Sequence, residues 1–267
     1  MTVAPVGNVR RVATKVGVFG AGGRMGATVC DAVASEPTLE LAAAVDPFRA
    51  GGLVATGLTI ADAPRALADA SVEVAVDFTT PDAAMGNLRW CAMHQVHAVV
   101  GTTGLGEAEL DELRHLFTAS NCVVAPNFAI GAVLMMRFAE LAAPFFETAE
   151  IIELHHNQKV DAPSGTAMMT ARRMADASSE WSADPTRVEV TPGARGGVGP
   201  GDIHVHSVRL RGLVAHQEVL LGTTGQSLTI RHDSYDRSSF MPGVLLAVKA
   251  VANRPGLTVG LDALLGF

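Results

Sequence analysis

A glycine-rich turn between an apolar strand and an apolar helix is the feature that most constrains the fold. Val16–Phe19 is a short apolar run, Gly20-Ala21-Gly22-Gly23-Arg24-Met25-Gly26 follows it, and an apolar helix is predicted from there through Val33. Glycines let a backbone approach a pyrophosphate, and a helix N-terminus supplies N–H donors and partial positive charge. The spacing departs from G-x-G-x-x-G because Met25 holds the third position. The turn predicts a dinucleotide site, with a tight turn in another α/β protein as the alternative.

An acid follows the next predicted strand. Leu39–Val45 reads as a strand and Asp46 comes directly after it, about 20 residues past the glycines. An acid in this place can accept hydrogen bonds from the adenosine ribose, although a turn aspartate before Pro47 is a competing interpretation. Arg49 can meet a 2′-phosphate or be a solvated loop charge.

Three further strand ends carry small or hydroxyl-bearing residues. Strands alternate with helices, which predicts a doubly wound parallel sheet with ligands beyond the carboxyl ends of its strands. The predicted strands are Val72–Phe78, His97–Val100 and Cys122–Ala125, and the predicted helices are Pro81–His94 and Glu107–Ala119. The motifs at that edge are Phe78-Thr79-Thr80, Gly101-Thr102-Thr103 and Ala125-Pro126-Asn127-Phe128. Ordinary turn chemistry explains any one of them, but three at one edge suit a ribose or nicotinamide.

The pattern changes after Phe128, and the chain is predicted to form a second, α+β domain with a mixed or antiparallel sheet. We expect domain boundaries at 1–128 and 129–237, with 238–267 packing back on the first domain. The predicted elements are helices at Ala129–Phe146, Ser164–Ala177 and Ser238–Asn253, and strands at Ala149–His155, Ile203–Leu210, Val214–Leu221 and Ser227–His232.

Proton-transfer groups gather between the first strand of this second domain and its next helix. His155, His156, Lys159 and Asp161 precede Ser164-Gly165-Thr166, where Ser164 is a plausible N-cap. Adjacent histidines on a strand point to opposite sides. A lysine can donate a proton, and a helix start suits a carboxylate. Each residue alone has an ordinary structural explanation, but together they describe a pocket for a small anion that takes up a proton.

Composition argues against a nucleic-acid-binding or membrane-spanning protein, and the spacing of His204 and His206 argues against a metal site. The net charge of −7 and the single tyrosine argue against a nucleic-acid surface. The longest apolar segment contains Arg137 and Glu140, which indicates a buried helix rather than a membrane span. The sequence starts without an apolar signal region, so we expect no secretory signal. Three widely spaced cysteines predict reduced, buried thiols in a cytoplasmic protein. His204 and His206 suggest zinc only weakly, because no partner has suitable spacing, so we expect no metal site.

The motifs together resemble the dihydrodipicolinate reductase family, in its actinobacterial branch. The resemblance spans the chain from about Val16 onward. It rests on the first glycine turn, Gly101–Gly104, Ala125–Phe128 and above all His155-His-x-x-Lys-x-Asp-Ala-Pro-Ser-Gly-Thr-Ala167. The segments Leu213–Val219 and Ile230–Ser234 carry the resemblance to the actinobacterial branch.

The resemblance implies an enzyme that reduces 4-hydroxy-tetrahydrodipicolinate to tetrahydrodipicolinate with NADH or NADPH, in diaminopimelate and lysine biosynthesis. It implies that His155 and Lys159 transfer protons and that a homotetramer forms through the second domain. The implied substrate ligands are His156, Gly165 and Thr166, to which the helix-start argument adds Ser164. The implied cofactor ligands are Gly20, Ala21, Gly22, Gly23, Arg24, Met25, Asp46, Gly101, Thr102, Thr103, Ala125, Pro126, Asn127 and Phe128, to which the strand-end argument adds Phe78.

Three departures from the family pattern refine this expectation. Gln158 stands where many members have a third histidine, which argues against an essential acid or base there. Pro47 rather than arginine follows Asp46, so we expect use of NADH or of both cofactors. The segment Pro47–Leu67 is longer than we expect for the actinobacterial branch. The alternatives are another two-domain nicotinamide oxidoreductase acting on an amino or keto acid, and a regulator that binds nucleotide without turnover.

Overall fold

The computed structural model describes residues 13–267, and the chain divides into two compact units. The first unit runs to Phe128 and resumes at Met241, and the second comprises Ala129–Phe240. Residues 1–12 lie outside the described residues, and the first strand begins at Thr14. No helix within residues 13–267 is long and apolar enough to cross a membrane.

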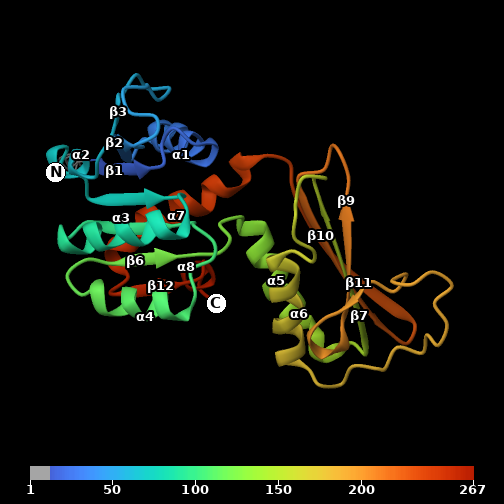
Figure 1. The fold of residues 1–267 in the computed structure, drawn as a ribbon. Helices are drawn as coiled ribbons and strands as arrows, with labels where there is room; N and C mark the ends of the chain where they lie inside the picture. The colour runs from blue at the N-terminus through green and yellow to red at the C-terminus, as the bar shows by residue number, and fades with distance from the viewer. Residues whose placement is uncertain (1–12) are drawn as a thin grey trace, which may run out of the picture. The chain divides into compact units, whose positions relative to one another are not determined.

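The first unit is built on a seven-stranded parallel sheet (Figure 1). Its order, β12-β6-β5-β4-β1-β2-β3, contains the strand order of doubly wound dinucleotide folds, which reverses between β1 and β4. Helix α1 packs on α7, and α3 packs on α4. The elements are β1 (Thr14–Phe19), α1 (Arg24–Ser35), β2 (Leu39–Val45), β3 (Ile60–Ala61), α2 (Arg65–Asp69), β4 (Val74–Asp77), α3 (Pro81–Met93), β5 (His97–Val100), α4 (Glu107–Leu116), β6 (Cys122–Val124), α7 (Met241–Ala250), a 3₁₀ turn η4 (Val251–Asn253), β12 (Leu257–Val259) and α8 (Asp262–Leu265).

Burial on both faces explains why these strands read as continuous apolar runs. All four residues of β4 are buried, as are the last four of β1. Parallel sheets are covered by helices on both sides, so their strands have no polar face. The predicted thiols also lie in this core: Cys30, Cys91 and Cys122 are buried and unpaired, and burial raises the pKa of Cys30 to about 12. None of them is poised as a nucleophile.

The second unit is a five-stranded mixed sheet, in the order β11-β10-β7-β9-β8, with α5 and α6 packed together on one face (Figure 1). Strand β7 pairs antiparallel with β10 and parallel with β9, so the sheet is mixed. The elements are α5 (Ile130–Ala142), η1 (Ala143–Phe145), β7 (Thr148–His155), α6 (Gly165–Ala177), β8 (Gly197–Val198), η2 (Pro200–Asp202), β9 (His204–Arg209), β10 (Ala215–Thr223), β11 (Gln226–Ser234) and η3 (Arg237–Phe240).

Prolines explain the changed bounds of two predicted helices. The predicted helix Ala129–Phe146 ends as an α-helix at Ala142, because Pro144 falls in the next turn, which is 3₁₀. The predicted helix Ser238–Asn253 begins as an α-helix only at Met241, with Pro242 in its first turn. The short β3, β8 and β12 were not predicted, because two or three residues carry too little periodicity.

The return of the chain to the first unit depends on a close backbone contact. A Cβ added at Gly243 in α7 would lie 2.1 Å from the carbonyl oxygen of Phe128. Gly243→Ala is therefore expected to destabilise the protein by about 1–3 kcal/mol. The control is Gly86→Ala in α3, where an added Cβ would meet no described atom within 4 Å outside the adjoining helix backbone, and helix propensity predicts a gain of about 0.5–1 kcal/mol. Urea unfolding measures both, and shifts of the same sign would contradict the packing argument.

Candidate active site

The glycine turn leads from β1 into the N-terminus of α1. Gly20 has φ +66°, a left-handed conformation that favours glycine, and the N–H of Gly23 donates to its carbonyl over 2.9 Å. A Cβ at Gly26 would lie 2.0 Å from that same carbonyl oxygen. Gly26 therefore provides the close helix–strand approach usually made by the fingerprint's third glycine, and the sequence prediction missed it. No side chain caps α1. This turn fits a pyrophosphate.

Asp46 follows β2, faces the glycine turn and is nearly buried. One carboxylate oxygen accepts from the N–H of Gly22 over 3.1 Å, and the other accepts from the N–H of Phe48 over 3.0 Å. The side chain of Arg49 lies against the turn, since a Cβ added at Gly22 would be 2.4 Å from its Cγ. The carboxylate of Asp46, expected at the adenosine end, and the Cβ and Cγ atoms of Arg49 therefore lie beside the glycines. The longer segment that follows folds back through a bridge between Leu53 and Thr59.

A buried acid holds together two of the strand-end motifs. Asp77 ends β4, and its Oδ1 accepts from the N–H of Thr79 over 2.8 Å and from the hydroxyl of Thr102 over 3.3 Å. Its Oδ2 accepts from Asn87 on α3 over 2.7 Å. The loops after β4 and β5 thus share one carboxylate. The sequence prediction did not select Asp77, although an acid at a strand's carboxyl end was a usable signal.

Aromatic packing sets the shape of the same edge. A Cβ at Gly101 would lie 2.0 Å from the ring of Phe78, so only glycine leaves room for that ring. The rings of Phe78 and Phe128 have centroids 5.6 Å apart. Ala125 and Phe128 are buried, whereas Thr103 and Pro126 are exposed and Asn127 is half-buried. The three motifs therefore lie at one sheet edge. Ala125 and Phe128 are packed beneath it, and Thr103 and Pro126 are exposed on it.

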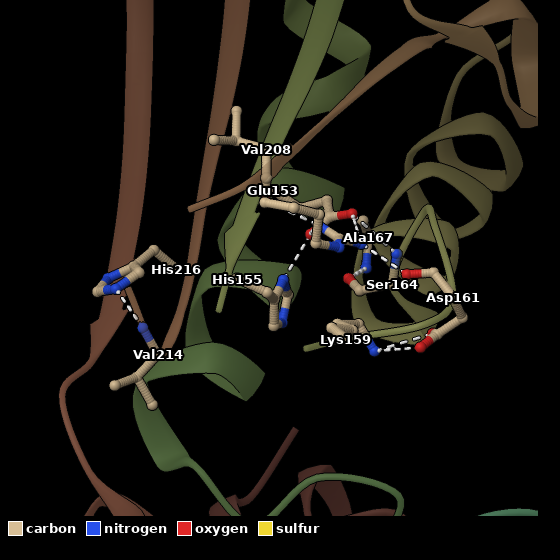
Figure 2. Close-up of polar contacts among 10 residues, drawn as sticks. Glu153, His155, Lys159, Asp161, Ser164, Ala167, Val208, Val214 and His216 are labelled. Carbon is tan, nitrogen blue, oxygen red and sulfur yellow. Dashed lines mark hydrogen bonds and ion pairs between the residues drawn. The ribbon is translucent and has the colours of Figure 1, made fainter. Parts of the chain in front are cut away.

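In the second unit, His155 ends β7 and is paired with a fully buried carboxylate. Its Nδ1 lies 2.5 Å from Oε2 of Glu153, whose side chain has 0% exposure (Figure 2). The guanidinium of Arg209 on β9 donates to both oxygens of Glu153, over 2.9 and 2.7 Å. Burial opposes the charge on Glu153, but hydrogen bonds from Arg209, Ser207 and His155 outweigh burial and hold its pKa below the usual range.

The pKa of His155 is lowered, first by burial and then by the positive charges of Lys159 and Arg209, while Glu153 works in the opposite direction. An imidazole with a lowered pKa is largely neutral near pH 7 and can both accept and return a proton. The geometry therefore suits an acid/base role at this strand end.

Lys159 lies in the loop between β7 and α6, and its Nζ is 2.8 Å from each carboxylate oxygen of Asp161 (Figure 2). This contact holds the pKa of Asp161 below its usual value. Asp161 is thus the charge partner of the lysine. His156 and Gln158 are exposed at the start of this loop, with the N–H of Gln158 donating to His156 Nδ1 over 3.3 Å.

Ser164 caps α6, as expected: its hydroxyl accepts from the N–H of Ala167 over 3.2 Å. Gly165 and Thr166 form the first turn, where backbone N–H groups have no carbonyl of their own helix to bind. A Cβ at Gly165 would meet no atom of the described chain within 4 Å. The start of α6 is therefore an open end with N–H donors, which suits a carboxylate.

Three other histidines of the second unit, His204, His206 and His216, lie on the other face of the sheet from His155. His232 lies on the same face as His155, opposite Gln217 and against Gly131 of α5. Strand alternation and register place His206 opposite Ile152 and His216 opposite Leu154, on the face not covered by α5 and α6. His206 pairs with Glu150 over 2.5 Å, and His216 with Asp233 over 2.7 Å. They cannot join His155 in one metal site, and residues 13–267 contain no cluster of three or more metal-ligating side chains.

In the second unit, Glu153 and Arg209 are functional candidates that sequence reasoning missed. Glu153 stands two residues before His155 on the same strand, so period-2 alternation was a usable signal. Arg209 is 54 residues from His155 in sequence and lies opposite it only because β9 pairs in parallel with β7. Nothing local in the sequence indicated that pairing.

Comparison with known proteins identifies the family. Residues 14–128 match the model of the dihydrodipicolinate reductase N-terminus, and residues 131–265 match that of its C-terminus. The chain belongs to the dihydrodipicolinate reductase family. The 4-hydroxy-tetrahydrodipicolinate reductase of Cutibacterium acnes is 54% identical over 260 residues, covering 95% of this chain and 99% of the relative. That of Mycobacterium ulcerans is 51% identical over 257 residues, with the same coverage. The resemblance inferred from the motifs, including its actinobacterial branch, is confirmed.

Solved structures agree. A dipicolinate-bound dihydrodipicolinate reductase from Paenisporosarcina sp. TG-14 is 39% identical, has a TM-score of 0.85, and the match covers 94% of this chain and 99% of that one. An amine dehydrogenase from Mycobacterium smegmatis, 13% identical with a TM-score of 0.64, shares the fold alone. The predicted fold class, a Rossmann-type parallel sheet with a second α+β domain, is confirmed. As a dihydrodipicolinate reductase family member, the chain is an oxidoreductase that uses NADH or NADPH.

Proposed function

We propose that this chain reduces 4-hydroxy-tetrahydrodipicolinate to tetrahydrodipicolinate, with release of water, in diaminopimelate and lysine biosynthesis, and that His155 and Lys159 transfer the protons. Family membership supports the reaction. The observation that supports the residue assignment is the half-buried His155, paired with an ionised acid, on the strand that leads to Lys159 and the open start of α6. A small dicarboxylate that takes up hydride and a proton needs these groups.

The first unit supplies the cofactor site. Gly20–Met25 would hold the pyrophosphate, with Gly26 allowing α1 to approach the turn, and Asp46 would accept from the adenosine ribose. The nicotinamide end would meet Phe78, Gly101–Thr103 and Ala125–Phe128. A bound nicotinamide supplies hydride, and the chain supplies binding, orientation and protons. We propose that NADH, or both cofactors, serve this chain, because Pro47 rather than arginine follows Asp46.

The second unit supplies the substrate site. Gly165 and Thr166 would donate backbone N–H groups to one carboxylate, with Ser164 fixing the helix start and His156 adding a ring donor. Lys159 both balances substrate charge and can donate a proton, while His155 accepts or returns one at Nε2 because Nδ1 is held by Glu153.

We further propose a cytoplasmic homotetramer formed through the uncovered face of the second unit's sheet. That face carries the apolar side chains Ile152, Leu154 and Leu220 beside the ionic pairs of Glu150 and Asp233. An apolar sheet face without helices is a surface that another copy can bury. The mass of the native protein in solution, from light scattering, tests this assembly, and a monomeric mass would refute it.

The reaction is tested by supplying aspartate semialdehyde, pyruvate and the preceding synthase, and following the absorbance of NADH and of NADPH in parallel. We expect absorbance to fall with NADH at least as fast as with NADPH. No loss with either cofactor would refute the proposed function, and a strong preference for NADPH would refute the cofactor assignment alone.

Lys159→Ala is expected to lower kcat by about 10²- to 10⁴-fold, because a positioned proton donor contributes on that scale. The dissociation constant for NADH, measured by fluorescence titration, should stay within about twofold because Lys159 belongs to the second unit. The control is Lys249→Ala, which removes a half-exposed ion pair with Glu36 in the first unit and should leave kcat unchanged. A comparable loss of NADH affinity in Lys159→Ala would show that the lysine binds cofactor instead.

A further inference from the structure

Glu153 is a fully buried carboxylate whose two oxygens are both occupied. Oε2 meets Nδ1 of His155 at 2.5 Å and Nη1 of Arg209 at 2.9 Å. Oε1 accepts from Nη2 of Arg209 at 2.7 Å and from the N–H of Ser164 at 3.3 Å. One side chain thus joins β7, β9 and the N-cap of α6 (Figure 2). Burying an ion is costly unless it is paired and hydrogen-bonded, and each of these contacts offsets that cost.

The pairing determines which ring nitrogen of His155 carries the proton. An ionised carboxylate only accepts hydrogen bonds, so Nδ1 must be the N–H in the neutral imidazole. Nε2 is then the lone-pair nitrogen that exchanges protons with a substrate. Rotation of the ring is opposed as well, because it would separate Nδ1 from an acid that is itself held at both oxygens.

Arg209 extends this control to the lysine. Its Nη2 also donates to the carbonyl oxygen of Asp161 over 2.7 Å, and the carboxylate of Asp161 binds Lys159. The charged groups that act on His155 are therefore Glu153 from its own strand, Arg209 from β9 and Lys159 from the following loop. Glu153 binds the Arg209 guanidinium directly, and Lys159 is linked to it through Asp161.

We infer that Glu153, held by Arg209, is a positioning residue that fixes the Nδ1–H tautomer and the orientation of His155 for proton transfer at Nε2. The inference rests on the proposed function, which makes His155 the acid/base group. Glu153 is not itself a catalytic residue, since its oxygens are filled by protein donors. Its effect should therefore appear in the state of His155 and in kcat rather than in substrate affinity.

The first measurement uses the unaltered protein. Imidazole ¹⁵N NMR on histidine-labelled enzyme, with the His155 signals assigned by their loss in His155→Asn, should show the Nδ1–H tautomer near neutral pH. This experiment needs no substrate, so its result is independent of whether the proposed reaction occurs. An Nε2–H tautomer at His155 would overturn the inference, even if no Glu153 variant can be folded.

The second measurement uses Glu153→Gln, which keeps the shape and removes the charge. Because Glu153 supports the protonated imidazole, its loss should move the His155 titration, and the matching limb of the pH profile of kcat, to lower pH. We expect kcat to fall by about 10- to 100-fold, because the variant should remove only part of the rate gain from general acid/base catalysis. KM should stay within about twofold. A His155 titration and kcat like those of the unaltered enzyme would overturn the inference.

The matched control is Glu150→Gln on the same strand. Glu150 also pairs with a histidine and an arginine, His206 and Arg195, but on the opposite face of the sheet. The titration of His155 should not move in this variant. An equal shift in both variants would mean that loss of any acid from β7 perturbs His155, and would overturn the specific role of Glu153.

Discussion

The second unit depends on one ionic contact, the two-point hydrogen bonding of Arg209 to the buried Glu153. Without the guanidinium, a charged carboxylate would remain inside the protein, which typically costs about 3–5 kcal/mol. With it, three segments meet at fixed positions: the end of β7, the end of β9 and the N-cap of α6. The polar loop from His156 to Pro163, which carries Lys159, is attached at both ends to this contact. His155 therefore lies on a rigid strand end, and the loop is held at its two ends.

The first unit also contains a buried carboxylate, and there neutral groups donate the hydrogen bonds. Asp77 is as deeply placed as Glu153, but its partners are hydroxyl, amide and backbone N–H groups rather than an arginine. Neutral donors fill the hydrogen-bonding capacity of the buried carboxylate without placing a cation beneath the loops. In both units, therefore, a buried acid at or near a strand end holds together chain segments that need to reach a ligand.

Local chemistry explains what the sequence predicted well. The glycine turn, the strand Leu39–Val45, the strand His97–Val100 and the cap at Ser164 depend on neighbouring residues, and the structure has them as expected. Glu153 and Arg209 were missed for a different reason. Their contact depends on β9 lying parallel beside β7 while β10 lies on the other side, and strand order in a mixed sheet is decided by packing over the whole unit.

At the adenosine end, too, the local sequence does not determine which side chain faces the ligand. The sequence places Asp46 and Arg49 three residues apart but does not say which of them faces the ribose. In the structure the carboxylate is held by the N–H groups of Gly22 and Phe48, so it stays beside the turn and favours a ribose hydroxyl over a phosphate. The Cβ and Cγ atoms of Arg49 lie against the same glycine. Asp46 is therefore the group that the backbone holds toward the glycine turn, which the spacing along the chain alone could not decide.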